Sequence, residues 1–139
     1  MAPAYRELVE ARAGGACECC RLLQAATGVT FHIEHVLPRS RGGLTLMSNL
    51  ALSCPGCNLA KADRIVGQDE SGREQRLFNP RMYEPWLLGW HLHFALDDHD
   101  SGMILPRTPA GQATVRALHM NDPLRVFARR LQILARLIG

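Results

Sequence analysis

The chain has 139 residues, of which 47% are hydrophobic and 21% are charged, and its 16 basic and 13 acidic residues give a net charge of +3. This composition is typical of a globular protein, and the length predicts one compact domain or a small domain with an extension. No apolar run reaches the roughly 18 residues that span a bilayer, and the N-terminus lacks the apolar core of a signal peptide. We therefore expect a cytoplasmic protein that is neither secreted nor inserted into a membrane.

The first half of the chain predicts short elements separated by turns. Residues 4–13 have helical apolar spacing and end at a glycine pair, which predicts a helix. Residues 29–36 are rich in β-branched residues and alternate, which predicts a strand, and residues 50–52 predict a second. The segment after Cys54 predicts a helix that runs to about residue 62.

The second half predicts a layer that covers the first. Residues 63–76 are polar and contain two glycines, so we expect a linker or an exposed loop. Residues 86–96 alternate like a strand, with residues 103–105 as the hairpin partner and Trp86 and Trp90 as core anchors. Two N-cap and proline pairs then predict two helices, Thr108-Pro109 and Asp122-Pro123.

The last predicted helix is amphipathic and basic. Its apolar residues form one stripe, which we expect to pack against the rest of the protein: Leu124, Phe127, Leu131, Leu134 and Ile138. Residues 123–139 contain no acidic residue and have four arginines, largely outside that stripe: Arg125, Arg129, Arg130 and Arg136. Because guanidinium binds phosphate oxygens well, these arginines predict either a phosphate-binding surface or simply a solvated helix face.

Four of the five cysteines form two Cys-x-x-Cys pairs, Cys17 with Cys20 and Cys54 with Cys57. Two such pairs in an intracellular chain predict a tetrahedral zinc site. Four thiolates leave no open coordination position, so this zinc would be structural. A pair of disulfides is the alternative that a reducing cytosol disfavours, and a redox sensor is another. Cys19 is expected to be inert.

The residues between and after the two cysteine pairs form an ordered array. It reads Phe31-His32-Ile33-Glu34-His35-Val36-Leu37-Pro38-Arg39-Ser40-Arg41-Gly42-Gly43, then Ser48-Asn49-Leu50, then Asn58 and Lys61. Over about residues 13–62 this array resembles the HNH endonucleases, which have a ββα-metal nuclease motif. The third letter departs from the family name, because Asn58 stands where a histidine would. That H-N-N variation is known in the family and keeps an oxygen ligand.

The resemblance implies hydrolysis of phosphodiester bonds in duplex DNA. It implies that His35 is the general base, that Glu34 and Asn58 hold one catalytic cation, and that Asn49 fixes the histidine and the loop by hydrogen bonds. The chemistry of the residues agrees with these roles. Imidazole titrates near neutral pH, and a carboxylate with an amide carbonyl suits Mg²⁺ or Mn²⁺.

Other polar residues near this array have weaker expectations. His32 lies two residues before Glu34 on the predicted strand, so we expect it beside the metal ligands or in a packing role. Arg39, Arg41 and Lys61 are expected to contact the DNA backbone, although a solvated loop would carry the same residues.

We therefore predict an α+β protein. Residues 1–64 would form a treble-clef-like HNH motif with a four-cysteine zinc site, and residues 65–139 would cover it with a β-hairpin and two helices. The function predicted is that of a metal-dependent DNA endonuclease with one structural Zn²⁺ and one catalytic Mg²⁺ or Mn²⁺. The alternative is a catalytically inactive, zinc-stabilised module that binds nucleic acid.

Overall fold

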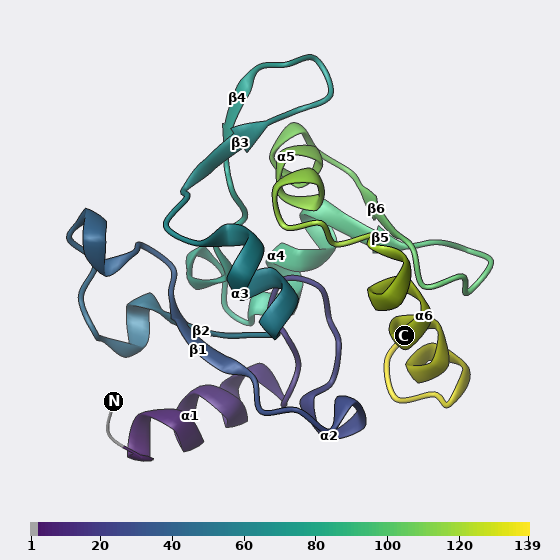
Figure 1. Cartoon of the computed structure of the whole chain (residues 1–139), viewed down its shortest axis with the longest axis horizontal. Helices are drawn as coiled ribbons and strands as arrows, with labels where there is room; N and C mark the ends of the chain where they lie inside the picture. The colour runs from purple at the N-terminus through teal and green to yellow at the C-terminus, as the bar shows by residue number, and fades with distance from the viewer. Residues whose placement is uncertain (1–2) are drawn as a thin grey trace.

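The computed structural model describes residues 3–139 and shows the predicted mixed α+β fold (Figure 1). The helices are α1 (Pro3–Ala13), α2 (Gln24–Thr27), α3 (Pro55–Lys61), α4 (Trp86–His93), α5 (Pro109–Ala117) and α6 (Pro123–Leu134). The strands are β1 (His32–His35), β2 (Leu50–Ser53), β3 (Val66–Gln68), β4 (Glu74–Arg76), β5 (Phe94–Leu96) and β6 (Ile104–Pro106). They pair in sequence order as separate antiparallel hairpins.

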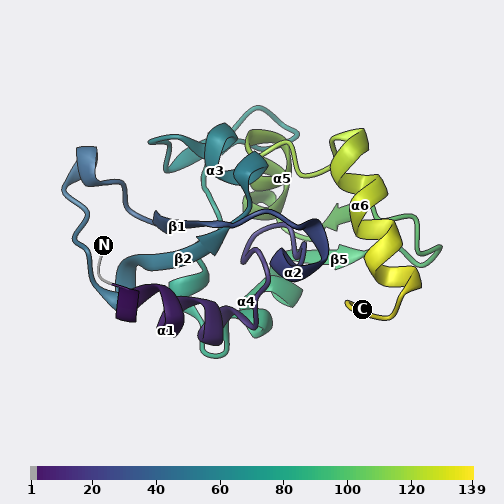
Figure 2. The ribbon, with the colours of Figure 1, turned by 60° about the horizontal axis from the view of Figure 1, so that its bottom comes forward.

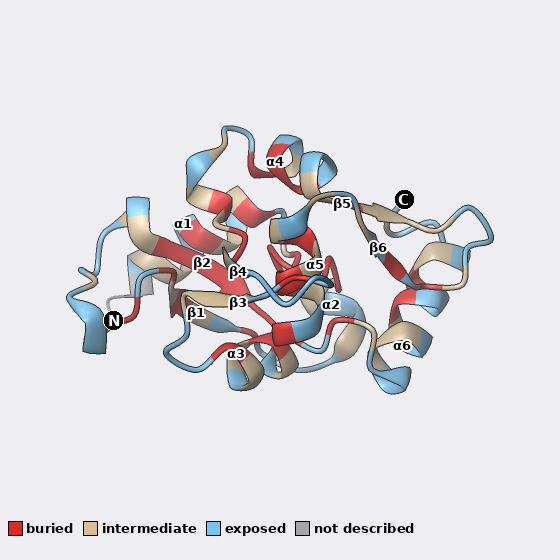
Figure 3. Cartoon of the chain, turned by 90° about the horizontal axis from the view of Figure 1, so that it is seen from above, coloured by how far each residue is buried: buried red, intermediate tan, exposed pale blue. Residues whose placement is uncertain are grey.

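The β1–β2 hairpin lies between two helices, with α1 against β2 and α3 against β1 (Figure 2). Its register places Glu34 opposite Ala51 and His35 opposite Leu50. All four residues of β2 are buried (Figure 3), and β1 begins at His32 rather than at the predicted residue 29. The Phe31 N–H is bonded to the Gln24 side chain at 2.7 Å, so the chain before β1 is held by α2 instead of by a strand partner.

The prediction of a linker over residues 63–76 is wrong, because this segment folds as the β3–β4 hairpin. Asp69 organises its turn: the carboxylate accepts the N–H groups of Ser71 at 2.9 Å and Arg73 at 3.0 Å. Gly72 completes the turn with a φ of +83°. The strands are short and polar, so the alternation that identifies a strand was missing from the sequence.

The prediction of one strand over residues 86–96 is also wrong, because only its last three residues are extended. Trp86 and Trp90 are four residues apart and both buried, so the segment follows a helical rather than an alternating period. Gly89 between them lies under the Tyr83 ring, where an added Cβ would come within 2.1 Å of that side chain. The predicted hairpin partner is confirmed, because β6 pairs with β5.

The two predicted C-terminal helices are present, but the last one buries an unexpected face. Thr108 caps α5 by accepting the Gly111 N–H at 3.0 Å, as its sequence predicted. In α6 the apolar stripe does not pack against the described residues: Leu124 is 84% exposed and Phe127 is 59% exposed. The buried side chains of this helix are instead Arg129 and Gln132. Within residues 3–139, no helix combines the length and apolarity needed to cross a bilayer.

Candidate active site and metal centre

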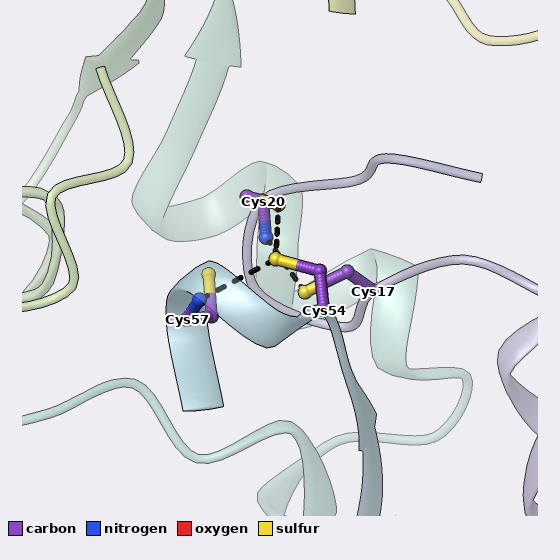
Figure 4. A group of neighbouring side chains, drawn as sticks. All are labelled: Cys17, Cys20, Cys54 and Cys57. Carbon is purple, nitrogen blue, oxygen red and sulfur yellow. Dashed lines mark hydrogen bonds between the residues drawn. The ribbon is translucent and has the colours of Figure 1, made fainter. Parts of the chain in front are cut away.

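The four cysteines of the two pairs converge in the structure (Figure 4). Cys17 and Cys20 lie in the turn after α1, whereas Cys54 and Cys57 flank the start of α3, where Pro55 occupies the first helical position. All four are buried, and their Sγ atoms lie within 4.8 Å of one another. None forms a disulfide.

This cluster fits a structural zinc ion. The Cys20 and Cys54 Sγ atoms are 3.5 Å apart, and Zn–S bonds of about 2.3 Å require tetrahedron edges of about 3.8 Å. Without a metal, hydrogen bonds from the other three cysteines lower the pKa of Cys54, whereas burial raises the pKa of Cys17 and hydrogen bonds raise the pKa of Cys57. The four soft donors leave no position open for a substrate.

Cys19 lies outside this cluster. It is 5% exposed, and burial raises the pKa of its thiol well above the ordinary value. Its backbone carbonyl accepts the Trp90 indole N–H at 2.7 Å. The residue therefore contributes a main-chain acceptor that connects the first cysteine pair to α4.

Glu34, in the middle of β1, is nearly buried. Its carboxylate lies 3.9 Å from the Lys61 Nζ, and in residues 3–139 no hydrogen-bond donor reaches its oxygens. Burial raises the pKa of Glu34 to about 7, and the positive charge of Lys61 only partly opposes that rise. The carboxylate therefore has free coordinating capacity. Asn58 is half-buried and precedes Lys61 by one turn, so it lies on the same side of α3.

Lys61, which the sequence predicted to contact the DNA backbone, is buried in the structure. It is 4% exposed, and its ammonium donates a hydrogen bond to the Val36 carbonyl at 3.0 Å. A side chain held in this way supports the end of β1 and is not an exposed DNA contact.

His35 is the last residue of β1 and is half-buried. Its Nε2 forms a 2.8 Å hydrogen bond with the Thr45 hydroxyl. Partial burial, and then the positive charge of Arg39, lower the pKa of the imidazole below its ordinary value. Both effects favour the neutral ring. His32, two residues earlier, is exposed.

Asn49 fastens the loop that follows His35. Its amide oxygen accepts the Leu37 N–H at 2.8 Å, and its Nδ2 donates to the carbonyls of Leu37 at 3.0 Å and Leu44 at 2.9 Å. Gly43 is required in the same loop, because an added Cβ would lie 1.7 Å from the Leu37 carbonyl oxygen. In the described chain, the Asn49 amide thus bonds loop backbone rather than the imidazole.

The exposed arginines of this region lie on the short 3₁₀ turn Arg39–Arg41. Arg41 donates from Nε to the Asp63 carbonyl at 2.7 Å, which ties the turn to the segment just after α3.

Nothing in the sequence indicated two further contacts at these sites. They are the Thr45 hydroxyl on His35, and Arg125, whose Nη1 donates to the Cys57 Sγ at 3.0 Å.

We compared the chain with protein-family models, curated proteins and solved structures. Residues 17–64 match the family model described as HNH endonuclease. Searches of curated proteins and of solved structures returned no match. The matched segment contains the four-cysteine cluster, the β1–β2 hairpin and α3. Over residues 17–64 this chain is therefore similar to the HNH endonucleases, a family of nucleases that act on the phosphodiester bonds of nucleic acid.

Proposed function

We propose that the chain is a metal-dependent endonuclease that hydrolyses phosphodiester bonds in duplex DNA, with His35 as general base. One observation carries this proposal. At the end of β1, the half-buried His35 imidazole directly follows a nearly buried carboxylate whose oxygens accept no hydrogen bond within residues 3–139. A base next to a carboxylate that can bind a cation is what metal-assisted hydrolysis requires.

Glu34 and Asn58 are the residues that would hold the catalytic cation. A carboxylate and an amide carbonyl are hard oxygen donors that suit Mg²⁺ or Mn²⁺. The burial that raises the pKa of Glu34 to about 7 also favours a nearby compensating cation. When bound, such a cation supplies charge stabilisation at the phosphate and at the leaving oxygen.

The rest of the site acts on the water and on the substrate. If the Nε2 of His35 donates its proton to Thr45, the lone pair on Nδ1 is free to accept a proton from the attacking water. Asn49 is a positioning residue, because it fixes the loop through Leu37 and Leu44. The exposed guanidinium groups of Arg39 and Arg41 would contact flanking phosphates without reading sequence.

We further propose that residues 1–64 form the nuclease unit and that residues 65–139 are an extension packed on it. Two contacts support the packing of the extension on the unit: the buried Glu18 carboxylate is paired with Arg81, and the Cys19 carbonyl is bonded to Trp90. Each contact joins the first cysteine pair to the segment beyond residue 65.

The test is a nicking assay with supercoiled plasmid, zinc-loaded protein and added Mg²⁺ or Mn²⁺. Wild type should nick the plasmid, and His35→Ala should lose nearly all of that activity. His99→Ala is the matched control, because His99 is exposed in the turn between β5 and β6. Parallel reactions with duplex and single-stranded RNA test the substrate class.

Two outcomes would contradict the proposal. Equal activity in wild type and His35→Ala would remove the imidazole from the mechanism. Salt-sensitive DNA binding without cleavage by either protein would instead favour the inactive, zinc-stabilised binding module.

A further inference from the structure

Two arginines of α6 reach the four-cysteine cluster from the far end of the sequence. Arg125 donates from Nη1 to the Cys57 Sγ at 3.0 Å, and its Nη2 bonds the carbonyls of Leu118 and His119. Arg129 is fully buried and donates to the Cys20 carbonyl at 3.3 Å. The two are four residues apart, so they lie on one face of the helix.

Within residues 3–139, neither guanidinium has a carboxylate partner. The ion pairs within residues 3–139 are Arg6–Glu10, Lys61–Glu34 and Arg81–Glu18. The other acceptors of Arg129 include the carbonyls of Gly102 at 2.6 Å and Met120 at 2.8 Å, which satisfy its N–H groups but carry no net charge. A buried cation without a counter-charge is strongly unfavourable, so the compensating negative charge must come from elsewhere.

The cysteine cluster can supply that charge. A zinc ion bound by four thiolates carries two net negative charges, and this anion would itself be buried because all four cysteines are buried. Two guanidinium groups at its edge carry two positive charges. The unpaired cations and the unpaired anion therefore compensate each other.

The second cysteine pair contains a glycine that leaves room for Arg125 to approach the Cys57 sulfur. Gly56, between Cys54 and Cys57, lies directly under Arg125, and an added Cβ would come within 3.1 Å of both the Cζ and the Nε of the guanidinium. A side chain at position 56 would therefore require the Arg125 guanidinium to shift by a few tenths of an ångström.

We propose that Arg125 and Arg129 are part of the metal centre: they balance the charge of the zinc–tetrathiolate and thereby anchor α6 to the two cysteine pairs. Zinc affinity then depends on a helix far from the ligands in sequence, and the position of α6 depends on the metal. This inference rests on the structural zinc and is independent of the proposed nuclease activity.

The test compares Arg125→Gln and Arg129→Gln with Arg130→Gln in the full chain. Arg130 is the matched control because it is exposed on the same helix. Competition with a chromophoric chelator should show metal affinity about 10–100-fold weaker in the first two variants, and wild-type affinity in the third. In Co²⁺-loaded protein, Arg125→Gln should also shift the thiolate-to-metal charge-transfer band to lower energy, because Cys57 loses a hydrogen bond.

Gly56→Ala provides a second approach if the arginine variants do not fold. It keeps every charge but displaces Arg125, so the charge-transfer band should shift in the same direction by a smaller amount. Wild-type affinity and an unshifted band in the Arg125 or Gly56 variants would overturn the proposal. Failure of the wild-type cysteines to bind Zn²⁺ or Co²⁺ would overturn it as well, whatever the nuclease assay shows.

Discussion

The Lys61 ammonium lies 3.9 Å from the Glu34 carboxylate, and both side chains are less than one-tenth exposed. This pair joins α3 to β1 beside the proposed catalytic residues. Lys61→Met should destabilise the zinc-loaded protein by about 3 kcal/mol at pH 8.5, because it leaves a buried carboxylate without a cation. Chemical denaturation in the absence of Mg²⁺ measures the change, and Arg39→Met is the control at an exposed position.

The loss in Lys61→Met should depend on pH. The pKa of folded Glu34, about 7, already exceeds its ordinary value, so ionised Glu34 costs stability that is regained as pH falls through the folded pKa. Removal of Lys61 raises this pKa further. The difference between variant and wild type should therefore be larger at pH 8.5 than at pH 6. An equal stability loss at both pH values would show that Lys61 does not stabilise the protein through the charge of Glu34.

Arg39 lies close enough to His35 for its charge to lower the pKa of the imidazole, after the larger effect of partial burial. If His35 is the base, kcat/KM rises with pH through this pKa. Arg39→Gln removes a positive charge and should move the acid limb of the pH–rate profile to higher pH. We choose the midpoint of the acid limb as the readout, because weaker DNA binding at all pH values would lower kcat/KM without moving this midpoint.

Arg41→Gln is the control for that experiment. Arg41 is an exposed arginine on the same turn, but its charge is not among the causes of the His35 shift. Its profile should keep the wild-type midpoint. A midpoint that is unchanged or lower in Arg39→Gln would contradict the assignment of the acid limb to His35.

Asn49 makes three hydrogen bonds to the backbone of the loop over residues 37–44. Asn49→Ala should lower the free energy of unfolding by about 1–3 kcal/mol, because it leaves loop groups unpaired. It should also reduce nicking more than the exposed neighbour variant Ser48→Ala. Gly43→Ala should have the same effects, since its Cβ would overlap the Leu37 carbonyl. Hydrogen exchange over residues 37–44 should increase in both site variants; unchanged protection would show that the loop does not depend on Asn49.

Local signals in the sequence predicted the elements that depend on local chemistry. The Cys-x-x-Cys spacing identified the four residues that cluster in the fold, and the segment after Cys54 forms the predicted helix α3. Thr108 predicted the cap of α5 for the same reason, because a side-chain acceptor and a proline act within one turn.

Tertiary contacts decided what these local signals could not. The segment beginning at Trp86 alternates in sequence but is helical, since Tyr83 packs over Gly89 and Trp90 bonds the Cys19 carbonyl. In α6 the apolar stripe predicted the wrong buried face. The acceptors of Arg129 come from several separate segments. The spacing of residues within α6 therefore could not predict that Arg129 would be buried.

Trp90 offers a direct measurement of how far the fold depends on metal. Its buried indole donates to the Cys19 carbonyl, next to Cys20 of the four-cysteine cluster. Zinc at a thousand times its Kd would contribute about 4 kcal/mol of stability, so a strong chelator should lower Tm and shift tryptophan emission to longer wavelength. Cys54→Ala should do the same without chelator. Cys19→Ala is the control, because it lies outside the cluster and keeps the carbonyl that Trp90 needs.

The same measurement separates zinc from the disulfide alternative. With zinc bound, a reductant alone should leave the emission and Tm unchanged, because the four thiols are already reduced and held by the metal. With two disulfides, a reductant would unfold the protein and a chelator would have no effect. A protein that keeps its Tm after complete zinc removal under reducing conditions would show that packing around Trp90 and the β1–β2 hairpin is sufficient without the metal.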